Sequence, residues 1–146
     1  MSRILGVDPG KKRVGLALSD DAAGTVALPL GLFERTGNDE KTAYDLAAHL
    51  DRTLEEGNVI VGIVMGLPLR LDGRESTASK RVRRFGTALG ETMNMEVHYW
   101  DERMTTVAAE GALRSMGMSA RKQRHVVDAT AATLLLQSFL DAQTNG

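Results

Sequence analysis

The segment VIVGIVMGLP at residues 59–68 constrains the fold of this chain most, because it contains no charged or hydrogen-bonding side chain. A strand with one face in water alternates apolar and polar residues, whereas this run is apolar at every position. Such a run is typical of a central strand that helices cover on both faces. The sequence therefore predicts an α/β domain in which a sheet lies between two layers of helices.

The other predicted elements are three strands before an alternation of helices and strands. They are strands 3–7, 13–20 and 25–35, helix 43–54, strand 59–68, helix 82–93, strand 95–100, helix 107–114 and helix 119–140. A Pro-Gly turn joins the first two strands, which predicts an antiparallel hairpin, while helical crossovers make the later strands parallel. Pro29 would place the third strand at a sheet edge or at a bulge. The 146 residues, 1–146, fit a single domain.

Composition excludes several classes of protein. The chain has no cysteine, so disulfides and thiolate metal sites are ruled out. It shows no signal peptide and no run of about 20 apolar residues that could span a membrane. We therefore expect a cytoplasmic protein with no membrane partner. The net charge of −1 gives no overall indication of a nucleic-acid partner.

A carboxylate ends the first predicted strand, within ILGVDPGKKRVGLALSD at 4–20. A buried carboxylate is costly unless it is hydrogen-bonded, paired or bound to a metal, so Asp8 is a candidate functional residue. The alternative is that Asp8 caps the Asp-Pro-Gly turn. We expect Gly10 to permit the chain reversal by adopting a positive φ.

Further carboxylates occupy comparable positions. Asp128 interrupts the apolar helix VVDATAATLLL, where an ion pair with Arg124 is the alternative explanation. Asp101 and Glu102 follow the strand at 95–100, where an ordinary solvent-exposed strand end is the alternative. Because successive side chains of a strand point to opposite faces, at most one of these two faces Asp8, and spacing does not choose between them.

Convergence of three carboxylates at one sheet end would be repulsive without a cation. Oxygen ligands in a chain without cysteine favour Mg²⁺ or Mn²⁺, as one or two ions. The three histidines, His49, His98 and His125, lack the spacing of zinc ligands. Carboxylate-held metal ions commonly hydrolyse phosphodiesters, which makes a nuclease the leading hypothesis.

Four segments of the chain resemble the YqgF/RuvX family in content and order. They are GVDPGKKRVGLALSD, VMGLPLRLDGRES, DERMTT and VVDATAATLLLQSFL, and together they span nearly the whole chain. Members are described as Holliday-junction resolvases or as nucleases that trim the precursor of small-subunit ribosomal RNA. The resemblance implies an RNase H-like fold, with a five-stranded mixed sheet flanked by helices on both faces and a carboxylate cluster at one end.

The resemblance also implies roles for individual residues. The catalytic and metal-binding acids would be Asp8, Glu102 and Asp128, with Asp101 as the alternative to Glu102. Many RNase H-like nucleases carry an acid at the end of the fourth strand, but this chain has MGLP at 65–68, so the acid of the DER segment would substitute. The implied activity is that of a Mg²⁺- or Mn²⁺-dependent endonuclease, acting either in rRNA processing and ribosome biogenesis or in DNA recombination and repair.

Basic residues are concentrated despite the nearly neutral total. Residues 70–84 hold six cations and two acids, and three more cations follow Gly10. A local basic face can bind phosphates even where net charge is small. The candidate nucleic-acid contacts are Lys11, Lys12, Arg13, Arg70, Arg74, Lys80, Arg81, Arg83, Arg84 and Arg103, and for any single one a solvated surface is the alternative. The partner would be an rRNA precursor or a four-way DNA junction, and symmetric junction cleavage would need a homodimer.

Two other functions compete with the nuclease. One is a non-catalytic RNA-binding module for ribosome assembly that keeps an RNase H-like shell. The other is an ATP-binding domain of the actin and sugar-kinase type, which also opens with an Asp-x-Gly hairpin. The second is disfavoured because such proteins close two lobes over the nucleotide, and 146 residues supply only one.

Overall fold

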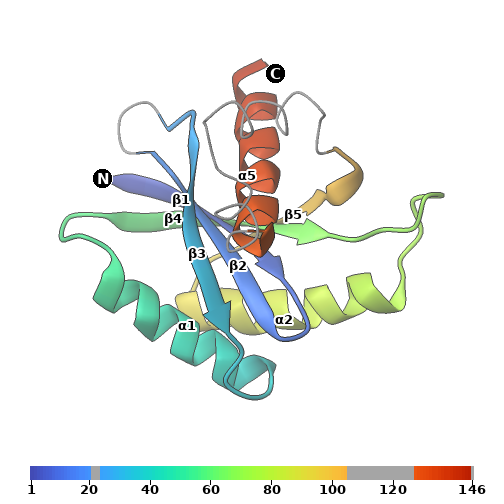
Figure 1. The fold of residues 1–146 in the computed structure, drawn as a ribbon, viewed down its shortest axis with the longest axis horizontal. Coiled ribbons are helices and arrows are strands. Elements are labelled where there is room, and N and C mark those ends of the chain that lie inside the picture. Colours follow the sequence, from blue (N-terminus) through green and yellow to red (C-terminus); the bar gives the residue numbers. More distant parts are fainter. Residues whose placement is uncertain (21–23, 105–126, 146) are drawn as a thin grey trace.

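The computed structural model describes residues 1–20, 24–104 and 127–145, and within the last helix the side chains of residues 131–143. Five strands form one sheet (Figure 1), in the order β3 (Ala27–Glu34), β2 (Arg13–Ser19), β1 (Ser2–Pro9), β4 (Val59–Leu67) and β5 (Val97–Asp101). The pairs β1–β2 and β2–β3 are antiparallel, whereas β1–β4 and β4–β5 are parallel. The predicted five-stranded mixed sheet is confirmed.

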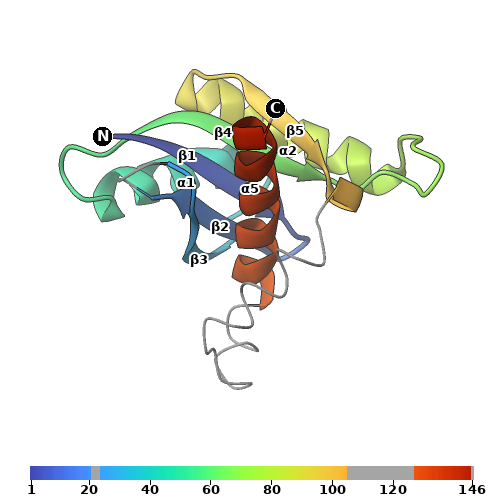
Figure 2. The same cartoon turned by 90° about the horizontal axis from the view of Figure 1, so that it is seen from above.

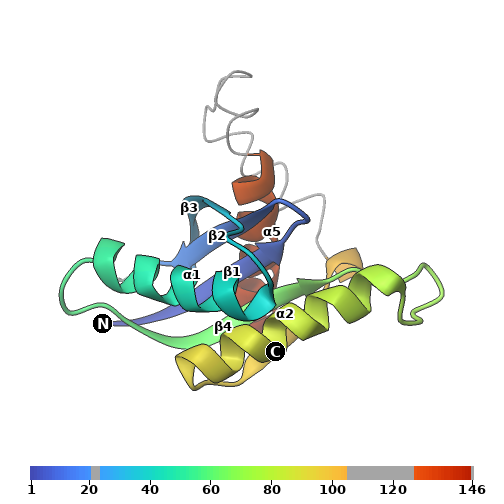
Figure 3. The ribbon, with the colours of Figure 1, turned by 90° about the horizontal axis from the view of Figure 1, so that it is seen from below.

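Helices cover both faces of this sheet, as the sequence predicts. Helices α1 (Asp39–Thr53) and α2 (Thr77–Met93) lie side by side across one face, as Figure 3 shows. Helix α5 (Val127–Asn145) crosses the other face (Figure 2). The helix predicted at 107–114 and the first residues of the helix predicted at 119–140 lie outside the described residues. No helix in the described ranges is long and apolar enough to cross a membrane.

The side chains of β1 alternate between two hydrophobic cores, one on each face of the sheet. Leu5 and Val7 are buried in the core that α1 and α2 form with the sheet. Gly6 points the other way, and a Cβ added there would lie 2.8 Å from Cβ of Leu136 in α5. Since side chains alternate along a strand, Asp8 faces α5 as Gly6 does. The side chain of Asp8 therefore lies on the α5 face of the sheet.

The coverage of β4 is less complete than its apolar sequence predicts. Residues Ile63 to Leu67 are buried, but Val59 and Val61 are 57% and 55% exposed. Ile60 packs against the core under α1 and α2, so Val59 and Val61 point to the opposite face. The prediction of burial on both faces is thus wrong for the first part of the strand and confirmed for the part beside Asp8.

The turn and edge features follow local residue chemistry. Strand β3 is an edge strand, and the register of its pairing with β2 shifts between Leu16 and Ala17, next to Pro29. The edge position predicted from Pro29 is confirmed. Gly10 does not adopt a positive φ, so that expectation is wrong. Instead, a Cβ at Gly10 would lie 2.6 Å from the carbonyl oxygen of Arg13, so the tight hairpin leaves no room for a side chain.

Candidate active site

Asp8 lies on β1 and Glu102 directly follows β5, a strand that is not a neighbour of β1, and a glycine makes their approach feasible. Glu102 begins the short 3₁₀ helix η1 (Glu102–Met104), directly after β5. Strand β4 lies between β5 and β1, and its Gly66 occupies the intervening position. A Cβ added at Gly66 would lie 3.0 Å from Oε1 of Glu102. The Glu102 carboxyl therefore lies over the bare backbone of β4 and reaches Asp8, with which it shares a hydrogen bond.

A cavity of about 240 Å³ contains both acids. Its lining consists of Asp8, Glu102 and three residues of α5, which are Ala131, Leu134 and Leu135. Part of the Glu102 side chain reaches solvent, but its carboxyl end lies against this cavity. Burial there raises the pKa of Glu102 above its usual range, the charge of Asp101 adds to the increase, and the hydrogen bond with Asp8 opposes it. The arrangement thus disfavours two negative charges on the pair.

The other acid of the DER segment faces a different partner. Nε of Arg103 donates to both carboxylate oxygens of Asp101, at 3.0 and 2.9 Å, and Nη2 donates to Oδ2 at 2.6 Å. This pairing lowers the pKa of Asp101 below its usual range. Nη1 of Arg103 donates to the carbonyl oxygen of Leu71 at 3.0 Å. Asp101 and Arg103 therefore hold the loop between β4 and α2, while Glu102 lies beside Asp8.

Asp128 is in the first turn of α5, and its side chain lies outside the described part of the chain. Position 128 is one turn before Ala131 and two turns before Leu135, both of which line the cavity. Among the side chains that the structure describes, no group of three His, Asp or Glu residues could hold a metal ion. The described part of the site is thus the pair of Asp8 and Glu102.

A buried serine joins η1 to α5. Nε1 of Trp100 donates to Oγ of Ser138 at 3.2 Å, and that hydroxyl donates to the carbonyl oxygen of Met104 at 2.9 Å. Ser138 is buried, so these bonds are shielded from water. They fix both ends of the segment that carries Glu102 against the helix that lines the cavity.

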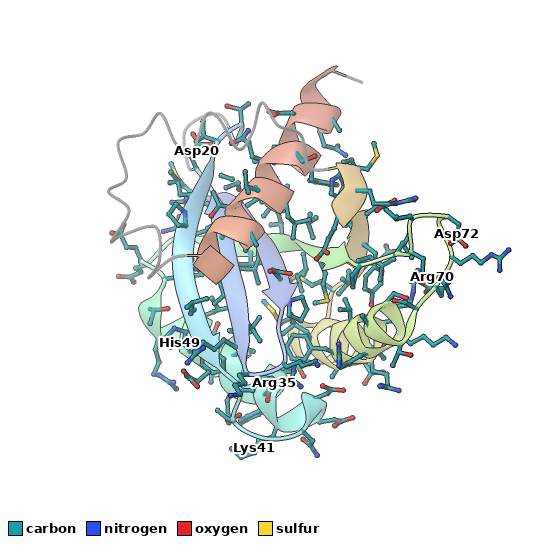
Figure 4. All side chains as sticks on the ribbon, turned by 45° about the vertical axis from the view of Figure 1, so that its right-hand side comes forward. Asp20, Arg35, Lys41, His49, Arg70 and Asp72 are labelled. Carbon is teal, nitrogen blue, oxygen red and sulfur yellow. The ribbon has the colours of Figure 1, made fainter. Side chains whose placement is uncertain are left out.

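The predicted phosphate-binding cations divide into three groups. Four have a carboxylate partner among the described residues, which are Arg13 with Glu34, Arg74 with Asp72, Arg83 with Glu75 and Arg103 with Asp101. Three others, Lys11, Arg81 and Arg84, line a second cavity together with Arg35. Lys12, Lys80 and Arg70 are exposed, and Figure 4 shows Arg70 and Asp72 on the loop before α2.

Two residues of these cavities and their surroundings, Gly66 and Arg35, were not singled out in the sequence. Gly66 lies within the MGLP segment, where the missing acid was noted; a glycine at that place is the signal that another side chain occupies the space. Arg35 ends the strand predicted at 25–35, and its backbone N–H donates to the carbonyl oxygen of Lys12 at 2.9 Å. Its place beside the hairpin depends on antiparallel pairing, which the sequence specified only in outline.

Comparisons with known proteins agree with this architecture. The model of a family described as "RuvX: Holliday junction resolvase" matches residues 2–142. A protein of Protochlamydia amoebophila named "Putative pre-16S rRNA nuclease" is 37% identical over 97% of this chain and 95% of its own length. One of Koribacter versatilis with the same name is 42% identical over 95% of this chain and 86% of its own length.

Solved structures with the same fold are more distant in sequence. RuvC of T. thermophilus, in complex with a Holliday junction substrate, superposes with a TM-score of 0.56 at 18% identity, covering 99% of this chain and 96% of that one. The Holliday junction resolvase of fowlpox virus gives a TM-score of 0.53 at 15% identity, covering 96% and 99%. The predicted RNase H-like fold is confirmed. Because the family model and relatives at 37% identity or more cover nearly all of it, this chain belongs to the RuvX (YqgF) family.

Proposed function

We propose that this chain is a divalent-metal-dependent endonuclease that hydrolyses phosphodiester bonds in structured nucleic acid. The observation that carries the proposal is the convergence of Asp8 and Glu102 over Gly66, in a cavity at the end of the central strand. A fold has no need to bring two carboxylates from non-adjacent strands into contact, because the contact is repulsive when both are ionised. The family and the names of its members favour nuclease chemistry over other uses of such a pair.

The donor set fits Mg²⁺ or Mn²⁺. Both described ligands are carboxylates, which are the hard oxygen donors that these ions prefer. The raised pKa of Glu102 marks a pair that a bound cation would stabilise in its doubly ionised form. We propose Asp128 as the third ligand from α5, with one or two ions held by the three acids. When bound, the metal would supply activation of water and stabilisation of the leaving oxygen.

The protein residues position the reacting groups. Asp8 is on the central strand, where it pairs with Gly15 of β2, and the residue before it, Val7, pairs with Met65 of β4. Glu102 is fixed through Trp100 and Met104, two residues to either side of it, which are both hydrogen-bonded to Ser138. Leu134 and Leu135 give the cavity an apolar wall, which lowers the local polarity and strengthens the electrostatic interactions beside it. These groups hold the acids in place before any substrate arrives, which is the requirement for efficient catalysis.

We propose that the exposed cations of the hairpin and of the loop at this end of the sheet, Lys12 and Arg70, contact backbone phosphates. Such contacts position the substrate without reading its sequence. The loop that Arg103 holds, at residues 68–76, follows β4 and so lies at the same end as Asp8, because β1 and β4 are parallel. We assign Arg103 a positioning role for this loop, since its donors already bind Asp101 and Leu71.

The names of the curated relatives favour an rRNA precursor as substrate, while the family description names the Holliday junction. The test is cleavage of a small-subunit rRNA precursor and a four-way DNA junction, side by side, with Mg²⁺, Mn²⁺ or EDTA, using Asp8→Asn as the matched inactive control. We expect metal-dependent cleavage of the precursor by the parent protein alone. Paired symmetric cuts in the junction would instead indicate a resolvase acting as a homodimer.

Binding without cleavage under every metal condition would contradict the nuclease and support the non-catalytic RNA-binding module. Saturable ATP binding would support the nucleotide-binding alternative. Equal cleavage by the parent protein and Asp8→Asn would indicate a contaminating nuclease and would contradict the proposed site.

A further inference from the structure

A second cavity lies at the same end of the sheet, on the face opposite Asp8 and Glu102. It has a volume of about 360 Å³ and is bounded by the β1–β2 hairpin, the segment before α1 and the first half of α2. Four cations line it, which are Lys11, Arg35, Arg81 and Arg84, against one carboxylate, Asp39. A concave site with a net positive charge of this size favours a strongly anionic ligand.

Arg35 is held rigidly in this cavity. Its Nη2 donates to Oδ1 of Asp39 at 2.5 Å, and its Cζ lies 5.1 Å from the ring centroid of Phe85. The Arg35 side chain is only 19% exposed, and Phe85 is fully buried beneath it. Figure 4 shows Arg35 where β3 ends, beside the start of α1. A guanidinium fixed in this way loses little rotamer entropy when it binds a phosphate oxygen.

The single carboxylate of the cavity is thus already paired with one of the four cations. No carboxylate among the described residues pairs with Lys11, Arg81 or Arg84. Their helix neighbour Arg83 differs, because it binds Glu75 and lies over the ring of Tyr99 at 4.8 Å. The positions 81, 84 and 85 share one face of α2, so Arg81 and Arg84 stand next to the ring that supports Arg35.

The end of β1 separates this cavity from the carboxylates. Asp8 lines the cavity on the α5 face, and the next residue, Pro9, lines the cationic cavity on the other. One phosphodiester cannot occupy both places, but a nucleic acid that crosses the hairpin tip can. We propose that the cationic cavity binds a backbone phosphate of the substrate away from the bond that is cut. This inference rests on the proposed function, and it specifies a substrate extended over several nucleotides rather than a short product.

The test measures binding separately from cleavage. A labelled rRNA precursor is titrated in EDTA, at several salt concentrations, with the parent protein, with Arg81→Gln/Arg84→Gln, and with the matched control Lys80→Gln/Arg83→Gln. Both pairs remove two exposed charges from the same helix, but only the first lines the cavity. We expect the first pair to weaken binding about tenfold or more and to lower the slope of log affinity against log salt by about 1–2. The control should lose much less.

A second arm uses Arg35→Lys, which keeps the charge and loses the planar fork. We expect it to raise KM for metal-dependent cleavage while kcat at saturation changes little. The melting temperature of each variant shows whether it is folded. Equal losses for both double variants, in a parent protein that cleaves, would overturn this inference and leave the nuclease proposal standing. If only Arg81→Gln/Arg84→Gln lowers the salt slope, and the parent protein cleaves nothing, the inference stands and the nuclease proposal is contradicted. Saturation by inorganic phosphate without displacement of nucleic acid would also overturn it.

Discussion

Substitution of Gly66 by alanine isolates the contact on which the candidate site depends. The new Cβ would lie 3.0 Å from Oε1 of Glu102, 3.4 Å from its Cγ and 3.3 Å from Cδ2 of Leu135. Relief of this crowding requires the Glu102 carboxyl to move by a few tenths of an ångström. Because a misplacement of about 1 Å can cost roughly 100-fold in rate, we expect kcat to fall about threefold to tenfold. Gly66→Val, which adds two more methyl groups at the same place, should cost about 100-fold or more.

Stability should respond differently from activity. Gly66 does not have a positive φ, so alanine is compatible with its backbone and restricts the unfolded chain, which stabilises by about 0.4–1 kcal/mol. The crowding opposes this gain. We therefore expect the free energy of unfolding of Gly66→Ala to lie within about 1 kcal/mol of that of the parent protein. Steady-state cleavage and denaturant unfolding, measured on the same samples, separate the two effects.

Gly62, in the same strand, supplies the control. A Cβ there would meet no atom within 4 Å, and its φ is also not positive. Gly62→Ala should therefore keep the activity of the parent protein and should be as stable or slightly more stable. The reasoning is refuted if Gly66→Ala cleaves as fast as the parent protein, or if Gly62→Ala loses as much activity as Gly66→Ala.

Three further predictions concern the acids. Asp8→Asn should abolish cleavage and leave stability unchanged or higher, because it removes charge repulsion; unfolding that is easier than in the parent protein would contradict this. Glu102→Gln should reduce cleavage more than Asp101→Asn, whose main effect should be faster proteolysis of the loop at 68–76; the opposite ranking would exchange their roles. The raised pKa of Glu102 means that its stabilising contribution is complete below the ordinary value of about 4.3 and is lost as pH rises through the raised value. In EDTA, the free energy of unfolding of Glu102→Gln, relative to that of the parent protein, should therefore increase with pH over that interval. A decrease would contradict the raised pKa of Glu102.

The order and type of most elements could be predicted from the sequence, because these depend on local patterns. The apolar run at 59–68 specified a central strand, and the Pro-Gly turn specified an antiparallel hairpin. The short apolar run at 3–7 singled out Asp8 as the acid at the end of a strand, without any knowledge of the neighbouring strands. The motif order specified the family, which the comparisons confirm.

Tertiary structure decided which acid stands beside Asp8. Asp101 and Glu102 are adjacent, and their spacings from every other motif differ by only one residue, so no local pattern distinguishes them. The choice depends on Arg103, which binds both Asp101 and the carbonyl oxygen of Leu71, 32 residues earlier in the chain. It also depends on Gly66, which leaves room for the Glu102 side chain to cross β4. It was likewise the pairing of β3 with β2 that brought Arg35 to the hairpin tip. Periodicity reports which face a side chain takes, whereas contacts between distant segments depend on strand order and register, and those are set by the packing of the whole sheet.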